Sequence, residues 1–319
     1  MEGVRYYFAP MEGITVWQFR RLHRQFFGGA DRYFSPFLSP NQHHVFSKKE
    51  LGDVLPEHNE GVPLVPQILT RRWEDFVWCA KELRAMGYQE VNLNCGCPSG
   101  TVTAKGKGAG MLLDLPALDR FLEEVFSHVD VAVSVKTRLG LVEPEEFEAI
   151  LAVYNRYPLS ELVIHPRVQA ELYRGAPHRE VFDACAPLAR APLCYNGDIV
   201  SAADCREFCR THPAVDRLML GRGLVGNPTL VREAKGGPAL GREELRDFHD
   251  ELYQSCCEAF HSERNALRPM KEIWFYLLNL FEEDPALTRA LRRCTDPAEY
   301  RLTVGRLFRE GKWRSGVRS

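Results

Sequence analysis

The 319-residue sequence contains no run of about eighteen consecutive apolar residues, which excludes a predicted membrane-spanning helix. Residues 1–5 lead directly into a strand-like run, so we predict no signal peptide. The formal net charge of −2 gives the chain no overall attraction to nucleic acid. None of the ten cysteines shows the paired CxxC spacing of structural zinc sites, so we predict reduced thiols, no metal site and a cytoplasmic protein.

Short apolar runs alternate with helical patterns from the start of the chain to about residue 225. The runs predicted as strands are 5–9, 31–35, 64–68, 90–94, 132–136, 161–165, 192–196 and 217–220. Helices are predicted near 16–27, 72–86, 115–127, 144–157, 179–189 and 202–210, and a long loop over 37–61. Eight strands that alternate with helices predict an α/β fold with a parallel sheet closed into a TIM (β/α)8 barrel.

The segment Lys235-Gly236-Gly237-Pro238 marks a change in the pattern. Beyond it the sequence is helical over 243–262, 270–281, 285–294 and 297–310. We therefore predict two domains, a catalytic barrel over residues 1–236 and a small C-terminal all-α helical bundle over residues 237–319. We also expect the chain to be a monomer.

Polar or glycine-rich residues follow seven of the eight predicted strands. Because the carboxyl ends of parallel barrel strands open on one face, where active sites form, we expect these residues to meet there. In chain order they are Pro10, Met11 and Glu12; Gln67; Asn94 and Cys97; Lys136 and Arg138; His165 and Arg167; Asn196, Gly197 and Asp198; and Gly221, Arg222 and Gly223.

The last two groups, Asn196-Gly197-Asp198 and Gly221-Arg222-Gly223, match the usual phosphate site of barrels. That site is built from backbone N–H groups, glycines and a helix N-terminus after the seventh and eighth strands. Arg222 adds a bidentate donor. The alternative interpretation of each group is a tight turn that caps a helix.

Three side chains at the predicted barrel mouth are candidates for chemistry. Lys136 is a candidate to stabilise negative charge on a reduced flavin ring. The alternatives are a lysine that forms a Schiff base and a surface lysine whose ammonium extends into solvent. His165 is a candidate donor to the ring or substrate, or a structural histidine. Cys97 is a candidate nucleophile, which needs a thiolate, or a general acid, which needs a protonated thiol.

Six motifs resemble those of the tRNA-dihydrouridine synthase family, in the same order. They are residues 8–15 (FAPMEGIT), Asn94-Cys95-Gly96-Cys97-Pro98, Val135-Lys136-Thr137-Arg138, His165-Pro166-Arg167, Asn196-Gly197-Asp198-Ile199 and Gly221-Arg222-Gly223. Arg268-Pro269-Met270-Lys271 and Trp274-Phe275-Tyr276 extend the resemblance into the helical region. The stretch Pro98-Ser99-Gly100-Thr101-Val102 leans toward the bacterial subgroup that modifies position 16.

The resemblance implies an oxidoreductase that uses NADPH to reduce a uridine of tRNA to 5,6-dihydrouridine. It implies hydride transfer from N5 of FMN to C6 of the base and proton transfer from Cys97 to C5. The FMN-binding residues would be Pro10, Met11, Glu12, Gln67, Lys136, His165, Asn196, Gly197, Asp198, Gly221 and Arg222. The expected substrate- and tRNA-binding residues are Asn94, Lys105, Arg138, Arg167, Arg268 and Lys271.

Two departures from the family pattern bear on substrate placement. Pro166 replaces a common glycine, and Ser35-Pro36 stands where many relatives have a Thr-Glu pair. Between residues 289 and 319, nine Lys and Arg outnumber three acids, a bias that fits phosphate contact by the helical region. The alternative functions are a flavin barrel of the dihydroorotate-dehydrogenase or old-yellow-enzyme type, acting on a small molecule, and a non-enzymatic tRNA-binding factor.

Overall fold

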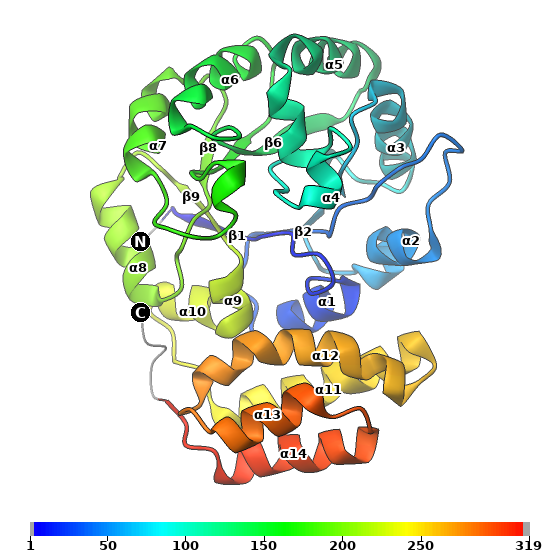
Figure 1. Ribbon diagram of the computed structural model, residues 1–319, viewed down its shortest axis with the longest axis vertical. Coiled ribbons are helices and arrows are strands. Elements are labelled where there is room, and N and C mark those ends of the chain that lie inside the picture. Colours follow the sequence, from blue (N-terminus) through cyan, green and yellow to red (C-terminus); the bar gives the residue numbers. More distant parts are fainter. Residues whose placement is uncertain (1–2, 315–319) are drawn as a thin grey trace.

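The computed structural model describes residues 3–314 and contains a barrel of parallel strands surrounded by helices, with further helices against one side (Figure 1). Every strand pairing is parallel, which confirms the predicted α/β barrel. The strands are β1 (Arg5–Phe8), β2 (Arg32–Phe34), β3 (Leu64–Val65), β4 (Gln67–Ile68), β5 (Glu90–Cys95), β6 (Ala132–Arg138), β7 (Leu162–His165), β8 (Leu193–Tyr195) and β9 (Arg217–Leu220).

The barrel closes through a strand that a proline interrupts. The sheet order runs β3-β2-β1-β9-β8-β7-β6-β5-β4, so β3 and β4 form its two ends. Only Pro66 separates these two strands, and it has no N–H to donate to the ladder. The Pro66 carbonyl still accepts a hydrogen bond from the Asn92 N–H at 2.9 Å. The single strand predicted over 64–68 is therefore two short strands that together close the ring.

Helices connect the strands around the outside of the barrel. They are α1 (Trp17–Phe26), α2 (Lys48–Val54), α3 (Trp73–Ala85), α4 (Gly100–Thr103), α5 (Leu115–His128), α6 (Phe147–Tyr154), α7 (Arg179–Cys185), α8 (Ala202–Thr211), α9 (Arg222–Gly226) and α10 (Leu230–Ala234). Short 3₁₀ helices are η1 (Pro56–His58), η2 (Gly108–Leu113), η3 (Pro144–Glu146), η4 (Gln169–Glu171) and η5 (Ala186–Leu188).

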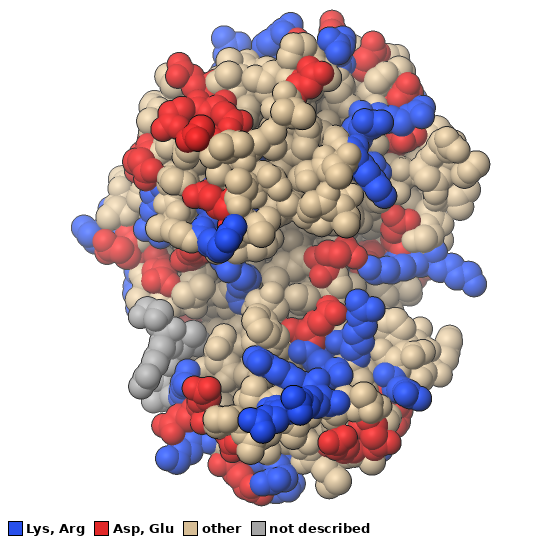
Figure 2. Space-filling model, in the orientation of Figure 1, with Lys and Arg blue, Asp and Glu red and all other residues tan. Residues whose placement is uncertain are grey.

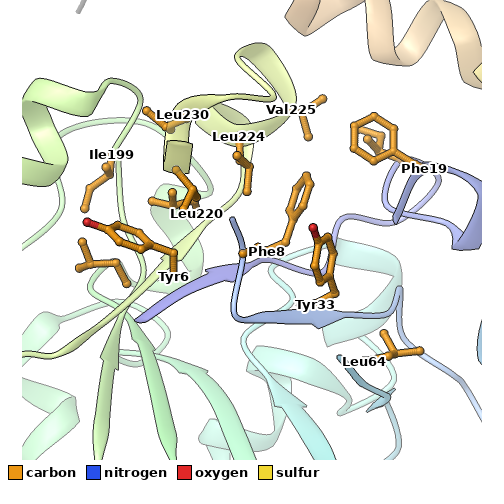
Figure 3. Packing of buried hydrophobic residues seen from close by; sticks show 14 of the residues in the cluster. Tyr6, Phe8, Phe19, Tyr33, Leu64, Ile199, Leu220, Leu224, Val225 and Leu230 are labelled. Carbon is orange, nitrogen blue, oxygen red and sulfur yellow. The ribbon is translucent and has the colours of Figure 1, made fainter. Parts of the chain in front are cut away.

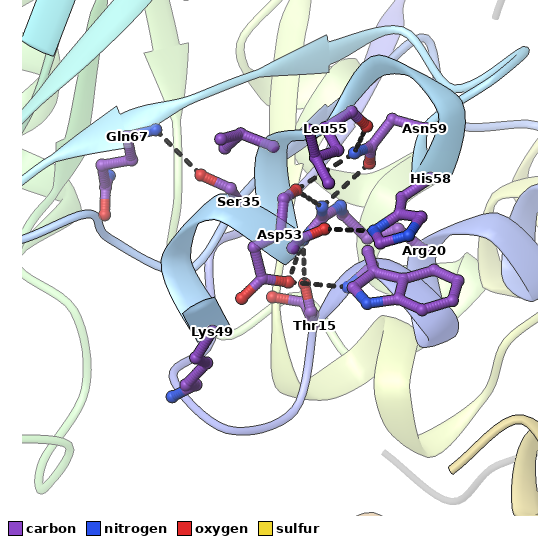
Figure 4. Close-up of polar contacts among 12 residues, drawn as sticks. Thr15, Arg20, Ser35, Lys49, Asp53, Leu55, His58, Asn59 and Gln67 are labelled. Atoms are coloured by element: carbon purple, nitrogen blue, oxygen red, sulfur yellow. Dashed lines mark hydrogen bonds and ion pairs between the residues drawn. The ribbon is translucent and has the colours of Figure 1, made fainter. Parts of the chain in front are cut away.

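The prediction of a continuous loop over 37–61 is wrong, because α2 lies within it. The Ser47 side chain accepts from the Glu50 N–H at 3.2 Å, and Glu50 accepts from the Ser47 N–H at 2.9 Å. This capping box starts the helix. A buried arginine then fixes the segment to α1: Arg20 donates to the Asp53 carbonyl at 2.5 Å and to Asn59 Oδ1 at 2.9 Å (Figure 4).

The C-terminal helices are α11 (Arg242–Phe260), α12 (Glu263–Leu277), α13 (Pro285–Arg293) and α14 (Pro297–Glu310), with the short η6 (Leu278–Leu280) after α12. The prediction that the second of these begins at residue 270 is wrong. Ser262 accepts from the Asn265 N–H at 3.2 Å and starts α12 seven residues earlier, with Pro269 inside the helix. No helix within residues 3–314 is long and apolar enough to cross a bilayer.

The C-terminal helices share a hydrophobic core with the barrel. On α11, Phe248 packs against Phe19 of α1, with ring centroids 5.5 Å apart, and against Phe27 at 5.0 Å. Residues of β1, β9 and α9 belong to the same core (Figure 3). The contact places α12 beside the carboxyl ends of the strands, where the predicted site lies (Figure 1).

Candidate active site

A cavity of about 510 Å³ opens at the carboxyl ends of the barrel strands. Most of the residues predicted for the site line it: Pro10, Met11, Glu12, Gln67, Asn94, Cys97, Lys136, Arg138, His165, Asn196, Gly197, Asp198, Gly221 and Arg222. Four do not, namely Lys105, Arg167, Arg268 and Lys271. The fold therefore brings strand ends that are far apart in sequence to one pocket.

The cavity also has aromatic walls that the sequence analysis did not assign. Tyr173 comes from the loop after β7, and Phe275 and Tyr276 come from α12. Phe37, which follows β2, completes this set, and Pro36 lines the cavity beside it. Phe275 and Tyr276 belong to a motif of the family resemblance, but only the packing of α12 against the barrel brings them to the mouth. The cavity is consequently built by both the barrel and the C-terminal helices.

The loop that carries Cys97 is held by the side chain of Asn94. Asn94 Oδ1 accepts hydrogen bonds from the N–H groups of Gly96 at 3.1 Å and Cys97 at 2.9 Å. Its Nδ2 must then donate, and it donates to Gln67 Oε1 at 2.7 Å. Gln67 Nε2 donates in turn to Asn92 Oδ1 at 2.8 Å. This buried chain of amides fixes the orientation of the Cys97 backbone.

Ser35, which follows β2, supports the same chain. Its hydroxyl accepts from the buried Gln67 N–H at 3.0 Å (Figure 4). Residues 35 and 36 are one of the two departures from the family pattern, and the contact gives Ser35 a structural role in placing Gln67.

Replacing Ser35 with alanine should destabilise the protein by about 1–3 kcal/mol, because it leaves the fully buried Gln67 N–H without an acceptor. Urea unfolding of the two proteins would measure the difference. Ser127→Ala, at an exposed serine on α5, is the matched control and should change the unfolding free energy much less. Equal stability of Ser35→Ala and the parent protein would contradict this role.

Cys97 is half-buried and lines the cavity. Burial raises the pKa of its thiol above the ordinary value, and the charges of Arg138 and Lys136 only partly oppose this effect. The thiol is therefore protonated near neutral pH, as a general acid requires and a nucleophile does not. Gly108 allows the following loop to pass close by, because its φ is +58° and a Cβ there would lie 2.8 Å from the Cys97 carbonyl oxygen.

Lys136 reaches the cavity from the middle of β6. Within residues 3–314 its ammonium makes no hydrogen bond or ion pair. Burial, followed by the nearby charge of Arg138, lowers the pKa of Lys136 to about 8. A partly buried cation without a partner that faces a cavity is suited to an anionic or electron-rich ligand, so a snorkelling surface lysine does not describe this residue.

His165 is buried at the end of β7, and one of its ring nitrogens has a fixed role. Arg167 Nη1 lies 3.1 Å from His165 Nε2, and a guanidinium can only donate. Nε2 must therefore accept. Burial and the charge of Lys136 hold the pKa of His165 well below its usual value, so the ring is neutral. The remaining proton is then on Nδ1, which makes His165 a hydrogen-bond donor to a ligand in the cavity.

Arg167 does not line the cavity. Its side chain is fully buried and donates to both Asp198 oxygens and to the Gly175 carbonyl. Direct contact with a substrate would require these bonds to break. The structure therefore points to Arg167 as a residue that positions His165 and Asp198, and not as the predicted substrate contact.

Asp198 joins the two loops predicted to bind phosphate. Burial alone would raise the pKa of its carboxyl, but the hydrogen bonds and charge of Arg167, together with the charge of Arg222, lower it. Arg222 donates to Asp198 Oδ1 at 2.6 Å. A Cβ at Gly223 would lie 2.4 Å from the Ile199 carbonyl oxygen, so only glycine lets the two loops pack this closely.

The other predicted contacts have different surroundings. Arg138 is buried and donates to the carbonyls of Gly96, Val168 and Leu172 at 2.6–3.0 Å, which ties the Cys97 loop to the loop after β7. Lys105 is exposed and does not line the cavity. The Arg268 side chain on α12 is 89% exposed, whereas Lys271 donates to the Cys294 carbonyl at 3.0 Å.

Lys and Arg side chains gather on the face formed by α12 and α13 (Figure 2). This face lies next to the barrel mouth in the view of Figure 1. Arg289, Arg292 and Arg293, which are part of the C-terminal basic bias noted in the sequence, lie on α13. Arg318, also counted there, lies outside the described residues.

Comparison with known proteins agrees with the fold. A family model described as dihydrouridine synthase (Dus) matches residues 7–310. The chain is 28% identical to a "Probable tRNA-dihydrouridine synthase" of Rhodobacter capsulatus, covering 95% of this chain and 94% of the relative. It is 30% identical to tRNA-dihydrouridine synthase B of Shewanella oneidensis, covering 70% and 69%.

Among solved structures, morphinone reductase superposes with a TM-score of 0.53 at 13% identity, covering 75% of this chain and 87% of that one. At this identity the likeness concerns the fold alone. The match of the family model over nearly the whole chain is decisive, and the chain belongs to the dihydrouridine synthase family.

Proposed function

We propose that this protein reduces a specific uridine of tRNA to 5,6-dihydrouridine, with FMN as cofactor and NADPH as reductant. The observation that carries the proposal is one cavity that combines a protonated thiol, an unpartnered cation and two glycine-containing loops. A small-molecule flavin barrel would not need the exposed basic face on α12 and α13 beside that cavity. The family to which the chain belongs favours the same conclusion.

The residues present fit a flavin mononucleotide. The closely packed loops 196–200 and 221–223, with Arg222, suit the phosphate. The Lys136 ammonium and the Nδ1–H of His165 suit the electron-rich edge of the ring, and Gln67 and the segment Pro10-Met11-Glu12 complete the walls. When bound there, FMN would supply the hydride that C6 of uracil accepts.

The chain's own residues would complete the reduction. Cys97 holds a proton because burial raises the pKa of its thiol, and it would deliver this proton to C5 of the base. Asn94 fixes the Cys97 loop through its side-chain oxygen and keeps one N–H free near the cavity to orient the base. The flipped-out uridine would enter between the barrel mouth and α12.

The basic face of α12 and α13 would contact the tRNA backbone. Replacing Arg268, which is exposed, with glutamine should weaken tRNA binding and lower the slope of log affinity against log salt by roughly one. Binding titrations of the FMN-loaded protein over a range of salt would measure the slope. Arg120→Gln on α5, exposed and far from the bundle, is the matched control and should leave the slope unchanged (Figure 1).

The proposal is tested with purified protein and tRNA transcribed in vitro, which carries no modified bases. Heating should release a yellow cofactor that mass spectrometry identifies as FMN. Incubation with NADPH should then add two hydrogens to one uridine, and digestion would identify its position. NADPH oxidation with no change in the mass of the tRNA would favour a small-molecule substrate instead.

Further features belong to the same proposal. The barrel over residues 1–236 would be the catalytic domain, and residues 237–319 would be the tRNA-binding domain. We also propose a cytoplasmic monomer. The position-16 assignment rests only on the sequence stretch after Cys97, and the mapping experiment above decides it.

A further inference from the structure

A second cavity of about 530 Å³ adjoins the catalytic one, between the loop after β7 and the end of α12. The two cavities share walls that include Tyr173, Asp198, Arg222, Phe275 and Tyr276. The second cavity adds Asn279 and Arg314, which come from η6 and from the residues after α14. It is therefore the direct continuation of the catalytic cavity along the C-terminal helices.

Two aromatic rings at the junction are exposed. Tyr173 is 55% exposed and Phe275 is 60% exposed, although each ring lines both cavities. Each also has an arginine over it: Arg222 lies 5.0 Å from the centre of the Tyr173 ring, and Arg292 lies 5.8 Å from that of Phe275. Exposed rings beside guanidinium groups are the usual platform for unpaired bases of a nucleic acid.

The polar groups of the second cavity suit a nucleotide. Within residues 3–314, neither the Asn279 amide nor the Arg314 guanidinium has a hydrogen-bond or ion-pair partner. Asp198 is already paired with Arg167 and Arg222. Arg314 is therefore a cation available to a phosphate, and Asn279 can pair with a base edge.

We propose that the second cavity binds the nucleotide that adjoins the target uridine in the RNA chain, with its base on Phe275 and its phosphate toward Arg314. This inference rests on the proposed function, because a uridine in the catalytic cavity remains covalently joined to its neighbours. A neighbour must leave through the mouth, and the second cavity continues from that mouth. The proposed subsite would read one neighbour and hold the target in register.

The test combines a protein change with a matching RNA change. After the modified uridine has been mapped, tRNAs are prepared in which the base of its 5′ or 3′ neighbour is absent. Their affinity for FMN-loaded parent protein, Phe275→Ala and Phe260→Ala is measured. Phe260 is an exposed phenylalanine at the end of α11 that lines neither cavity, so it is the matched control.

For the parent protein and Phe260→Ala, removal of one neighbour's base should weaken binding roughly 10- to 100-fold. For Phe275→Ala the same removal should have little effect, because the ring that stacks on this base is already absent. If intact tRNA is reduced, two results would overturn the inference: an equal loss of affinity in all three proteins when the base is removed, or no loss of affinity in any of them. If intact tRNA is not reduced at all, it is the proposed function that fails.

The same variants separate this subsite from one for the reductant. With the tRNA subsite, Phe275→Ala should lose the sensitivity of tRNA binding to the missing base. A raised KM for NADPH, together with unchanged sensitivity to the missing base, would assign the second cavity to the reductant and overturn the inference.

Discussion

Cys97→Ala should bind FMN and oxidise NADPH as the parent protein does, but form dihydrouridine roughly 100- to 10,000-fold more slowly. The reason is that the variant lacks the protonated thiol that faces the cavity, whereas the phosphate loops and Lys136 are unchanged. Stopped-flow absorbance would follow flavin reduction, and mass spectrometry of tRNA would follow the product. A native rate of dihydrouridine formation by Cys97→Ala would show that another group supplies the proton.

Cys209→Ala is the matched control for this experiment. Cys209 is also half-buried, but it lies on α8 outside the cavity. It should therefore retain the parent rate of both half-reactions. A similar loss in Cys209→Ala would mean that the effect of Cys97→Ala arises from protein stability and not from chemistry.

Lys136→Met should reduce the rate of flavin reduction roughly 100- to 1,000-fold, because it removes the positive charge placed beside the reduced ring. It should also weaken FMN binding. Lys81→Met, at an exposed lysine on α3, is the control that should change neither quantity. A parent rate of flavin reduction in Lys136→Met would contradict the assignment of this lysine to the cofactor.

The same substitution should stabilise the FMN-free protein. A pKa lowered from 10.5 to about 8 means that the folded state binds the Lys136 proton less tightly than the unfolded state. This difference in proton affinity corresponds to a destabilisation of the folded state of on the order of 3 kcal/mol below pH 8. Because the side chain is partly open to the cavity, we expect only about 1–2 kcal/mol of this destabilisation, which Lys136→Met would remove. Urea unfolding at pH 7 would measure the gain.

The lowered pKa of Lys136 also fixes the sign of the pH dependence of the free energy of unfolding. Between about pH 8 and pH 10.5 the unfolded chain binds more protons than the folded chain, so this term makes the parent protein more stable as pH rises. Lys136→Met lacks the term, and the gain in stability from the substitution should shrink across this window. A constant difference between the two proteins from pH 7 to pH 10 would contradict the lowered pKa.

The strand ends could be predicted from the sequence because local chemistry marks them. Asn94, Lys136 and Asn196 each follow a short apolar run, and the barrel then requires them to share one face. The direction of each side chain could not be predicted in this way. Arg167 also follows a strand, yet it does not line the cavity, because the Asp198 carboxylate and the Gly175 carbonyl accept its hydrogen bonds.

Two other differences between the prediction and the structure have separate causes. The start of α2 had a local signal, since Ser47 and Glu50 have the spacing of a capping box, and the loop-like residues around them obscured it. Phe275 belongs to the Trp274-Phe275-Tyr276 motif, but that motif does not specify that its ring lines the cavity. Its ring reaches the cavity only because α12 packs beside the barrel mouth, a contact between segments distant in the sequence.

The most direct test of the proposed reaction is a single turnover without oxygen. Protein loaded with FMN is reduced with one equivalent of NADPH, and unmodified tRNA is then added while the flavin absorbance is followed. We expect the absorbance of the oxidised flavin to return and one uridine per flavin to gain two hydrogens. A flavin that stays reduced while the tRNA is bound would contradict the proposal that this cavity reduces uridine in tRNA.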